Sequence, residues 1–292
     1  MSRLFAVALL VAVAGCGGSG DASPERAPWL LPAVCHPGGV ACVDAVVTEM
    51  TTRFEPLAIE CDHRAPFALM YLRVTEAVGR EERSGSLRAD RVYLSHLDAV
   101  FAQLYFDASD AWAAGMRRTV PAAWQIAFEA AKRRRVSGIG NLLLGMNAHI
   151  SRDLPFAVAS IGLGARNGSA RARAFAKINE VLADVQAAIL REASTRFDPS
   201  IAGFRLPVLK VDAATVGLLI GTWRDGALED GRRLLRAKTP AARAAVTRTI
   251  EDNAAGRAAI IVAATSRVPF SEVGKARDLS CKSAARQPAG SP

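Results

Sequence analysis

The sequence predicts an all-α protein, a single domain of about eight helices without a significant β-sheet. Apolar residues recur at three- and four-residue steps, no comparable stretch alternates apolar and polar residues, and capping signals precede several of the apolar runs. The composition agrees, because 50% of the 292 residues are hydrophobic and alanine, the best helix former, is the most frequent residue type. We expect this helical domain over residues 35–282.

Four helices are expected in the first half of the domain. The third has the clearest periodicity, with four apolar residues on one face, and the fourth follows a start signal made by Thr119 and Pro121. These helices are predicted over residues 40–54, 65–79, 90–108 and 120–135, and the periodic residues of the third are Tyr93, Leu97, Val100 and Leu104.

Four further helices are expected in the second half. Thr239 before Pro240 places a capping hydroxyl ahead of a first-turn proline, which marks the start of the last of them. The others are identified by apolar residues at helical spacing. The predicted ranges are 139–164, 170–197, 212–236 and 240–265, and the supporting residues include Leu142, Met146, Phe175, Ile178, Leu182, Val216, Leu219 and Trp223.

The first sixteen residues predict export. A short positive start is followed by an apolar run of roughly ten residues, too short to cross a bilayer as a helix, and by small residues before Cys16. The segment Val13-Ala14-Gly15-Cys16 resembles the lipobox of bacterial lipoproteins. The resemblance implies a signal peptide over residues 1–15, a lipidated Cys16 that anchors the protein to the membrane of the cell envelope, and a flexible tether over residues 16–34. An ordinary secretory signal is the alternative.

The positive charge belongs to the folded domain. The formal net charge is +9, and removal of the signal peptide takes away only one basic residue, Arg3. Nucleic acid is not expected as a partner, because no aromatic-interleaved basic stripe or zinc-finger spacing occurs. Anionic lipid or an acidic envelope polymer is the expected electrostatic partner, with a merely solvated basic face as the alternative. No feature of the sequence indicates an oligomeric state.

Four cysteines remain in the domain, and export makes disulfides the expected state. If helices run over residues 40–54 and back from about residue 64, Cys42 and Cys61 lie roughly 15 to 20 Å apart, beyond disulfide reach. We therefore predict disulfides between Cys35 and Cys42 and between Cys61 and Cys281. A zinc site formed by these cysteines and neighbouring histidines is the alternative, although no paired C-x-x-C spacing supports it.

Polar residues within the apolar stripes are the candidate functional residues, because a buried polar group without a partner costs about 1 to 3 kcal/mol. His149 and Asp153 lie one helical turn apart, so their side chains are expected to meet or to share a ligand. Pro155 follows, and we expect a kink or break beside the pair. Asp98 lies on an apolar face of the helix over residues 90–108 and needs a partner.

The segment GMNAHISRDLP, residues 145–155, resembles the signature of an uncharacterised bacterial family, domain of unknown function 5995. Segments around Glu76, Asp98 and Trp124 also resemble that family, which implies no known activity. A more distant likeness is to the zinc-dependent phospholipases C, all-helical exported enzymes that use an HxxxD pair as metal ligands. Only His149 and Asp153 match, and the further histidines of those enzymes are missing.

These observations favour a metal-dependent hydrolase acting on an ester or phosphoester. One divalent metal ion, zinc or a similar one, would be bound by His149, Asp153 and either Asp98 or Glu76. The other of these two carboxylates would serve as general base, and Asn147 or Arg152 would orient the substrate. The alternatives are a non-catalytic, metal-free ligand pocket and a purely structural role. In the structural interpretation Asp153 accepts a hydrogen bond from His149, and Asp98 pairs with a buried arginine.

Overall fold

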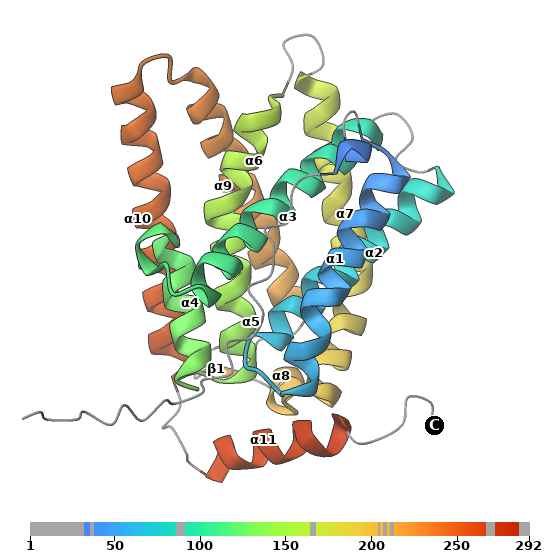
Figure 1. The fold of residues 1–292 in the computed structure, drawn as a ribbon, viewed down its shortest axis with the longest axis vertical. Helices are drawn as coiled ribbons and strands as arrows, with labels where there is room; N and C mark the ends of the chain where they lie inside the picture. Colours follow the sequence, from blue (N-terminus) through green and yellow to red (C-terminus); the bar gives the residue numbers. More distant parts are fainter. Residues whose placement is uncertain are drawn as a thin grey trace, which may run out of the picture.

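The computed structural model describes residues 32–35, 38–85, 91–163, 168–203, 205–206, 209–210, 213–266 and 272–285. Within these ranges the chain is helical nearly throughout and forms a single helical bundle (Figure 1), which confirms the predicted all-α class, with slightly more helices than the eight expected. The elements are η1 (Ala33–Cys35), α1 (Val40–Ile59), α2 (Ala65–Ser84), α3 (Arg91–Ala113), η2 (Arg117–Thr119), α4 (Ala122–Lys132), α5 (Gly138–Asn147), η3 (Ala148–Asp153), α6 (Leu154–Ile161), α7 (Gly168–Arg196), α8 (Ser200–Gly203), β1 (Arg205–Leu206), β2 (Leu209–Lys210), α9 (Ala213–Arg236), α10 (Pro240–Thr265) and α11 (Glu272–Ala285).

The helix predicted over residues 139–164 does not break at Pro155. It runs as α5, then widens into the π-helical turn η3, and continues as α6. At the end of η3 the amide of Leu154 donates to the carbonyl of His149, five residues earlier, which is the π-helical pattern. A proline has no amide proton, and in a regular α-helix its ring crowds the carbonyl four residues before it. A wider turn relieves that conflict without ending the helix.

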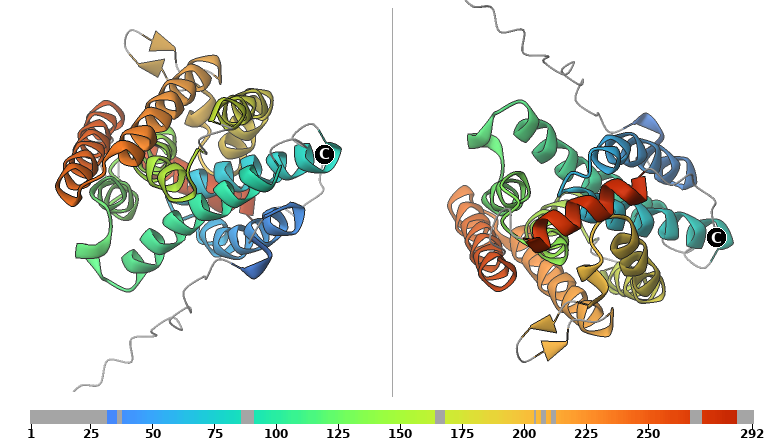
Figure 2. Two further views of the ribbon diagram at one scale, coloured as in Figure 1. Left: turned by 90° about the horizontal axis from the view of Figure 1, so that it is seen from above. Right: turned by 90° about the horizontal axis from the view of Figure 1, so that it is seen from below.

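The segment α5–η3 forms the axis of the bundle. Every residue of α5 is buried, and helices α2, α3, α4, α9 and α10 pack around α5 and η3, as the end-on views show (Figure 2). Close approach depends on Gly145, where a Cβ atom would lie 2.3 Å from the ring of Phe67 on α2. The residues with the most unusual backbone therefore lie in the centre of the molecule.

Both predicted disulfides are present, Cys35–Cys42 and Cys61–Cys281. The second ties the end of α1 to α11, a helix that the sequence did not lead us to expect, and α11 lies across one end of the bundle (Figures 1 and 2). The predicted loose tail over residues 283–292 is partly wrong, because α11 continues to Ala285. The rest of that tail, the signal peptide, Cys16 and the tether up to residue 31 lie outside the described residues.

The small antiparallel pair β1–β2 is the only strand pairing of more than one bridge in the described ranges, and it does not contribute to the bundle axis. Among the helices described, none has both the length and the apolar character needed to cross a membrane.

Candidate functional site

A buried polar centre lies at η3 and consists of Trp124, His149, Arg152 and Asp153. The side chains of His149 and Asp153 meet, as their spacing predicts, with 3.2 Å between Nδ1 and Oδ2. Asp153 is fully buried, and it also accepts hydrogen bonds from the indole of Trp124 at 2.8 Å and from Arg152 at 3.0 Å. Arg152 in turn donates to Glu251 on α10 at 2.8 Å. The carboxylate is thus compensated by three donors, as a buried charge requires.

His149 is enclosed by aromatic rings. Its imidazole stacks on Phe101, with 3.4 Å between ring centroids and 7° between planes, and the ring of Tyr71 lies 4.3 Å away. Burial lowers the pKa of His149, although Asp153 acts in the opposite direction. The neutral imidazole then donates from Nδ1 to Asp153, which leaves the lone pair on Nε2 buried without a partner among the described residues.

These residues do not fit the predicted metal centre. In the part of the chain that the structure describes, no three His, Cys, Asp or Glu side chains lie close enough to hold a metal ion. Glu76 bonds Arg73 at 3.0 Å, and Arg73 also binds Glu192 on α7 at 2.8 Å, so Glu76 belongs to a half-buried ion-pair network. Both carboxylate oxygens of Asp153 already accept hydrogen bonds within the protein. The metal and general-base roles assigned from the sequence therefore have no assembled ligand set within the described ranges.

Asn147 has a different role from the substrate-orienting one predicted. Its side chain is fully buried, its amide group donates to the carbonyl of Ala254 at 2.8 Å, and its oxygen accepts from Arg257 at 3.5 Å. Both partners lie on α10. Asn147 therefore joins the bundle axis to α10, and both polar atoms of its side chain are engaged within the protein.

Asp98 lies in an apolar cavity beside the polar centre. The cavity, of about 60 Å³, is enclosed by α2, α3, α6, α7 and α9, and its polar lining consists of Asp98, Tyr71 and Arg224. Atom Oδ2 of Asp98 and the hydroxyl of Tyr71 are buried without hydrogen-bond partners in the described part of the chain. Burial, with a smaller contribution from the Glu82 carboxylate, raises the pKa of Asp98 to about 7. The buried arginine expected to pair with Asp98 is present in the cavity, but it forms no ion pair with it.

That arginine is Arg224 of α9. It is 7% exposed, and it donates to two neutral oxygens, at 2.6 Å to the side chain of Asn179 and at 3.2 Å to the carbonyl of Phe175. Its guanidinium also lies 4.2 Å from the ring centroid of Phe175. Burial lowers the pKa of Arg224 to about 10. Arg224 thus lines the same cavity as Asp98.

Sequence reasoning missed Tyr71. An available signal was the repeat of polar side chains on the buried face of α2, where Tyr71, Thr75 and Glu82 all carry buried oxygens that lack partners among the described residues. Their spacing follows the helical period, so they belong to one face. A tyrosine within an apolar stripe is usually a core-packing residue, so the sequence alone did not indicate Tyr71 as a candidate site residue.

The family comparison covers most of this architecture. Residues 43–264 match the model of the family of unknown function DUF5995. No curated protein and no solved structure matches the chain.

Proposed function

The chain belongs to the DUF5995 family, whose function is unknown. We propose that it is an exported envelope lipoprotein, and that it binds a small amphipathic molecule in the cavity lined by Asp98 and Arg224. The observation that carries the proposal is the presence of two opposite charges in one apolar cavity, neither of which has an ionic partner among the described residues. Isolated charges in apolar surroundings are costly unless something compensates them.

The chemistry of the lining defines the ligand class. Asp98 offers an acceptor for an amine or hydroxyl group, and the guanidinium of Arg224 offers donors for a carboxylate or another acceptor. Aliphatic and aromatic side chains supply the remaining surface. A smaller hollow of about 20 Å³ adjoins the first and shares Val74 and Leu182 with it, which suits a short apolar extension. The ligand is thus a small molecule with a polar, preferably zwitterionic head and an apolar body.

Binding rather than hydrolysis is the function that this site supports best. Two groups with unusual ionisation, Asp98 and Arg224, line the cavity, where they are positioned for recognition. The polar centre next to the cavity has a structural role in this proposal. Its Asp153 carboxylate accepts from three donors within the protein, and these contacts hold η3 in place.

The test is a thermal-shift screen followed by calorimetry, using short-chain amines, short-chain carboxylates and apolar amino acids. At least one of these compounds should raise the melting temperature of the wild-type protein, because a ligand that binds only the folded state stabilises it. Asp98→Asn and Arg224→Met should each abolish that increase, whereas Glu76→Gln, which lies outside the cavity, should retain it. An increase that survives both cavity variants would disprove the proposed site.

The lipoprotein part of the proposal has its own test. The sequence of residues 1–16 and the two disulfides, which suit an oxidising compartment, support it. Cells fed a clickable palmitate analogue should label the wild-type protein but not Cys16→Ser. Labelling of that variant, or recovery of the unlabelled wild-type protein from the soluble fraction, would contradict acylation at Cys16.

A further inference from the structure

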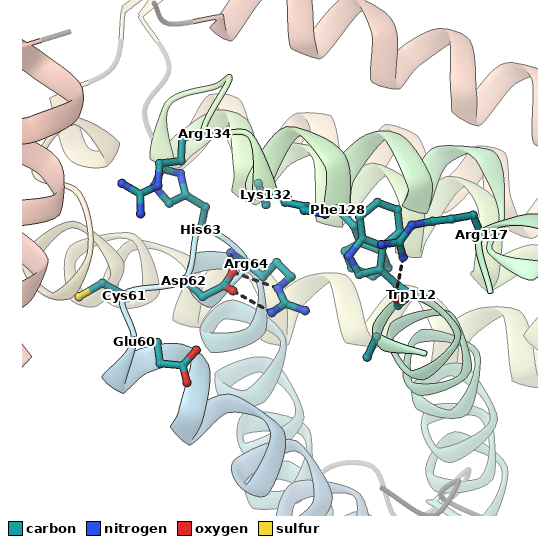
Figure 3. A pocket seen from close by; sticks show the side chains of 12 residues that line it. Glu60, Cys61, Asp62, His63, Arg64, Trp112, Arg117, Phe128, Lys132 and Arg134 are labelled. Carbon is teal, nitrogen blue, oxygen red and sulfur yellow. Dashed lines mark hydrogen bonds and ion pairs between the residues drawn. The ribbon is translucent and has the colours of Figure 1, made fainter. Parts of the chain in front are cut away.

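A hollow between the α1–α2 connection and α4 is rich in cations. It has a volume of about 420 Å³ and lies where that connection faces the ends of α3 and α4 and the turn η2. We call it the basic cleft. Its wall carries the aromatic residues Trp112 and Phe128 and the cations Arg64, Arg117, Lys132 and Arg134. Figure 3 shows the side chains of Arg64, Arg117 and Lys132 around one opening, each from a different element.

The acids near the cleft do not balance these cations. Asp62 binds Arg64 through two contacts, of 3.0 and 2.7 Å. Arg117 lies over the indole of Trp112, with 3.3 Å from its guanidinium carbon to the ring centroid, and donates to the carbonyl of the same residue. Among the described residues neither Arg117 nor Lys132 has an acidic partner. The cleft therefore holds two cations whose charge no group in the described part of the chain neutralises.

The carboxylate of Asp278, next to the cleft, does not offset the charge of Arg117 or Lys132. Arg134 binds Asp278, and the same carboxylate accepts from Arg277 at 2.9 Å and faces His63 at 3.3 Å. Burial, followed by the nearby Arg277, lowers the pKa of His63 to about 4, so that this histidine is neutral at physiological pH. Glu60 also lines the cleft, but it forms no ion pair with Arg117 or Lys132 among the described residues.

The positive charge continues beyond the cleft. An open hollow of about 640 Å³ shares Trp112 and Arg117 with the cleft and is lined by Arg133 and Arg135. Glu129 also lines this hollow, and it pairs with Arg133. Successive residues of the basic run at the end of α4 thus alternate between the two hollows, with Lys132 on the cleft side. Together the two concavities form a path of cations longer than one small anion occupies.

We propose that the basic cleft and the adjoining hollow bind an extended polyanion, a linear envelope polymer with repeated phosphate groups. Guanidinium groups recognise phosphate oxygens with directed, charge-assisted hydrogen bonds, and Lys132 adds a mobile point charge. A chain of phosphates can follow the path from one hollow into the next. A flat lipid surface meets a planar or convex basic face, whereas here the cations lie in a concavity with an aromatic wall. This site is separate from the Asp98 cavity and does not depend on the proposed function of that cavity.

The experiment measures binding of the full-length chain to inorganic polyphosphate by fluorescence anisotropy at increasing salt. The wild-type protein should bind, and its affinity should fall steeply as salt screens the charges. Arg117→Gln with Lys132→Gln should weaken binding roughly tenfold or more. The matched control is Arg243→Gln with Arg248→Gln, which removes the same charge from exposed positions of α10. Equal melting temperatures of the two double variants establish that both are folded.

Each outcome decides the proposal. Selective weakening by the cleft variant supports it. Equal weakening by both double variants would mean that net charge alone is responsible, and this would overturn the site. Absence of polyphosphate binding would also overturn it, and binding only to phosphatidylglycerol vesicles would assign the basic surface to a membrane instead.

Discussion

Replacing Asp98 with asparagine is expected to stabilise the protein, and by more at high pH than at low pH. In the unfolded chain this carboxyl group has its ordinary pKa of 3.8, and in the folded protein the pKa is about 7. Between these values the unfolded chain has released a proton that the folded chain still holds. The free energy of unfolding therefore falls as the pH rises from about 4 to about 7, and the loss is complete above the folded pKa.

The shift sets the size of the effect. A difference of roughly three pH units corresponds to about 4 kcal/mol at pH 8, and by pH 5 only a little over one unit, about 2 kcal/mol, has been lost. An asparagine at this position would not titrate, and its own cost as an unpaired buried group, about 1 to 3 kcal/mol, is the same at both pH values. The gain of Asp98→Asn over wild type should thus be larger at pH 8 than at pH 5 by about 2 kcal/mol. Because Asp98 is half-buried, solvent screening reduces this effect, and we expect the stabilisation by Asp98→Asn to differ between pH 8 and pH 5 by at least about 1 kcal/mol.

Urea denaturation followed by circular dichroism at pH 5 and pH 8 measures this difference directly. Asp252→Asn, at an exposed position of α10, is the control for loss of one negative charge, and its effect should be nearly independent of pH. If Asp98→Asn destabilises the protein equally at both pH values, the carboxyl group is compensated in the folded state, and the reasoning about the cavity fails.

Three further substitutions test the bundle axis and its covalent tie. Trp124→Phe removes the indole donor to the buried carboxylate of the polar centre, and calorimetry should detect a loss of about 1 to 3 kcal/mol. Gly145→Ala would force a methyl group to within 2.3 Å of Phe67, so its urea midpoint should fall by the equivalent of about 1 to 3 kcal/mol, and an unchanged midpoint would show that α2 can move away. Cys281→Ser opens a disulfide that spans 220 residues, and by the chain-entropy relation its loss costs about 5 kcal/mol, which a lowered melting temperature should report. A negligible change would indicate a compact unfolded state.

Features that depend on residues close together in the sequence, such as helices, caps and contacts within one helical turn, were predicted correctly. Helical periodicity located nearly every long helix, and Thr239 caps α10 by accepting from the amide of Ala242 at 3.1 Å, as its sequence position indicated. The length expected for the first helix favoured the disulfide pairing that is observed, because a helix of that length separates Cys42 from Cys61. The contact between His149 and Asp153 likewise follows from a four-residue spacing.

The remaining features depend on neighbours that are distant in sequence. Glu76 looked available as a metal ligand because the sequence does not reveal the ion-pair network that engages it. That network includes Glu192 on α7, more than 100 residues away in the sequence. A kink or break beside the His149–Asp153 pair was expected because an isolated helix has no means of holding a wider turn at Pro155. In the bundle, α3, α4, α9 and α10 pack against η3. An ionic partner for Asp98 was expected from the cost of burial. In the described part of the protein Asp98 has no such partner, and no pattern of residues in the sequence indicates that a buried carboxyl group stays unpaired.

The disulfide between Cys61 and Cys281 also constrains how the protein is made. On the proposed export route, Cys35 and Cys42 emerge together and can close at once, since they lie 7 positions apart in the sequence. On that route Cys61 remains a free thiol until α11 has emerged, and until then it can mispair with Cys35 or Cys42 by thiol–disulfide exchange. Correct oxidation thus depends on early formation of α1, which keeps Cys61 out of reach of Cys42, or on an isomerase that resolves the mispaired chain. Production in a reducing cytoplasm would lack this final closure of the bundle.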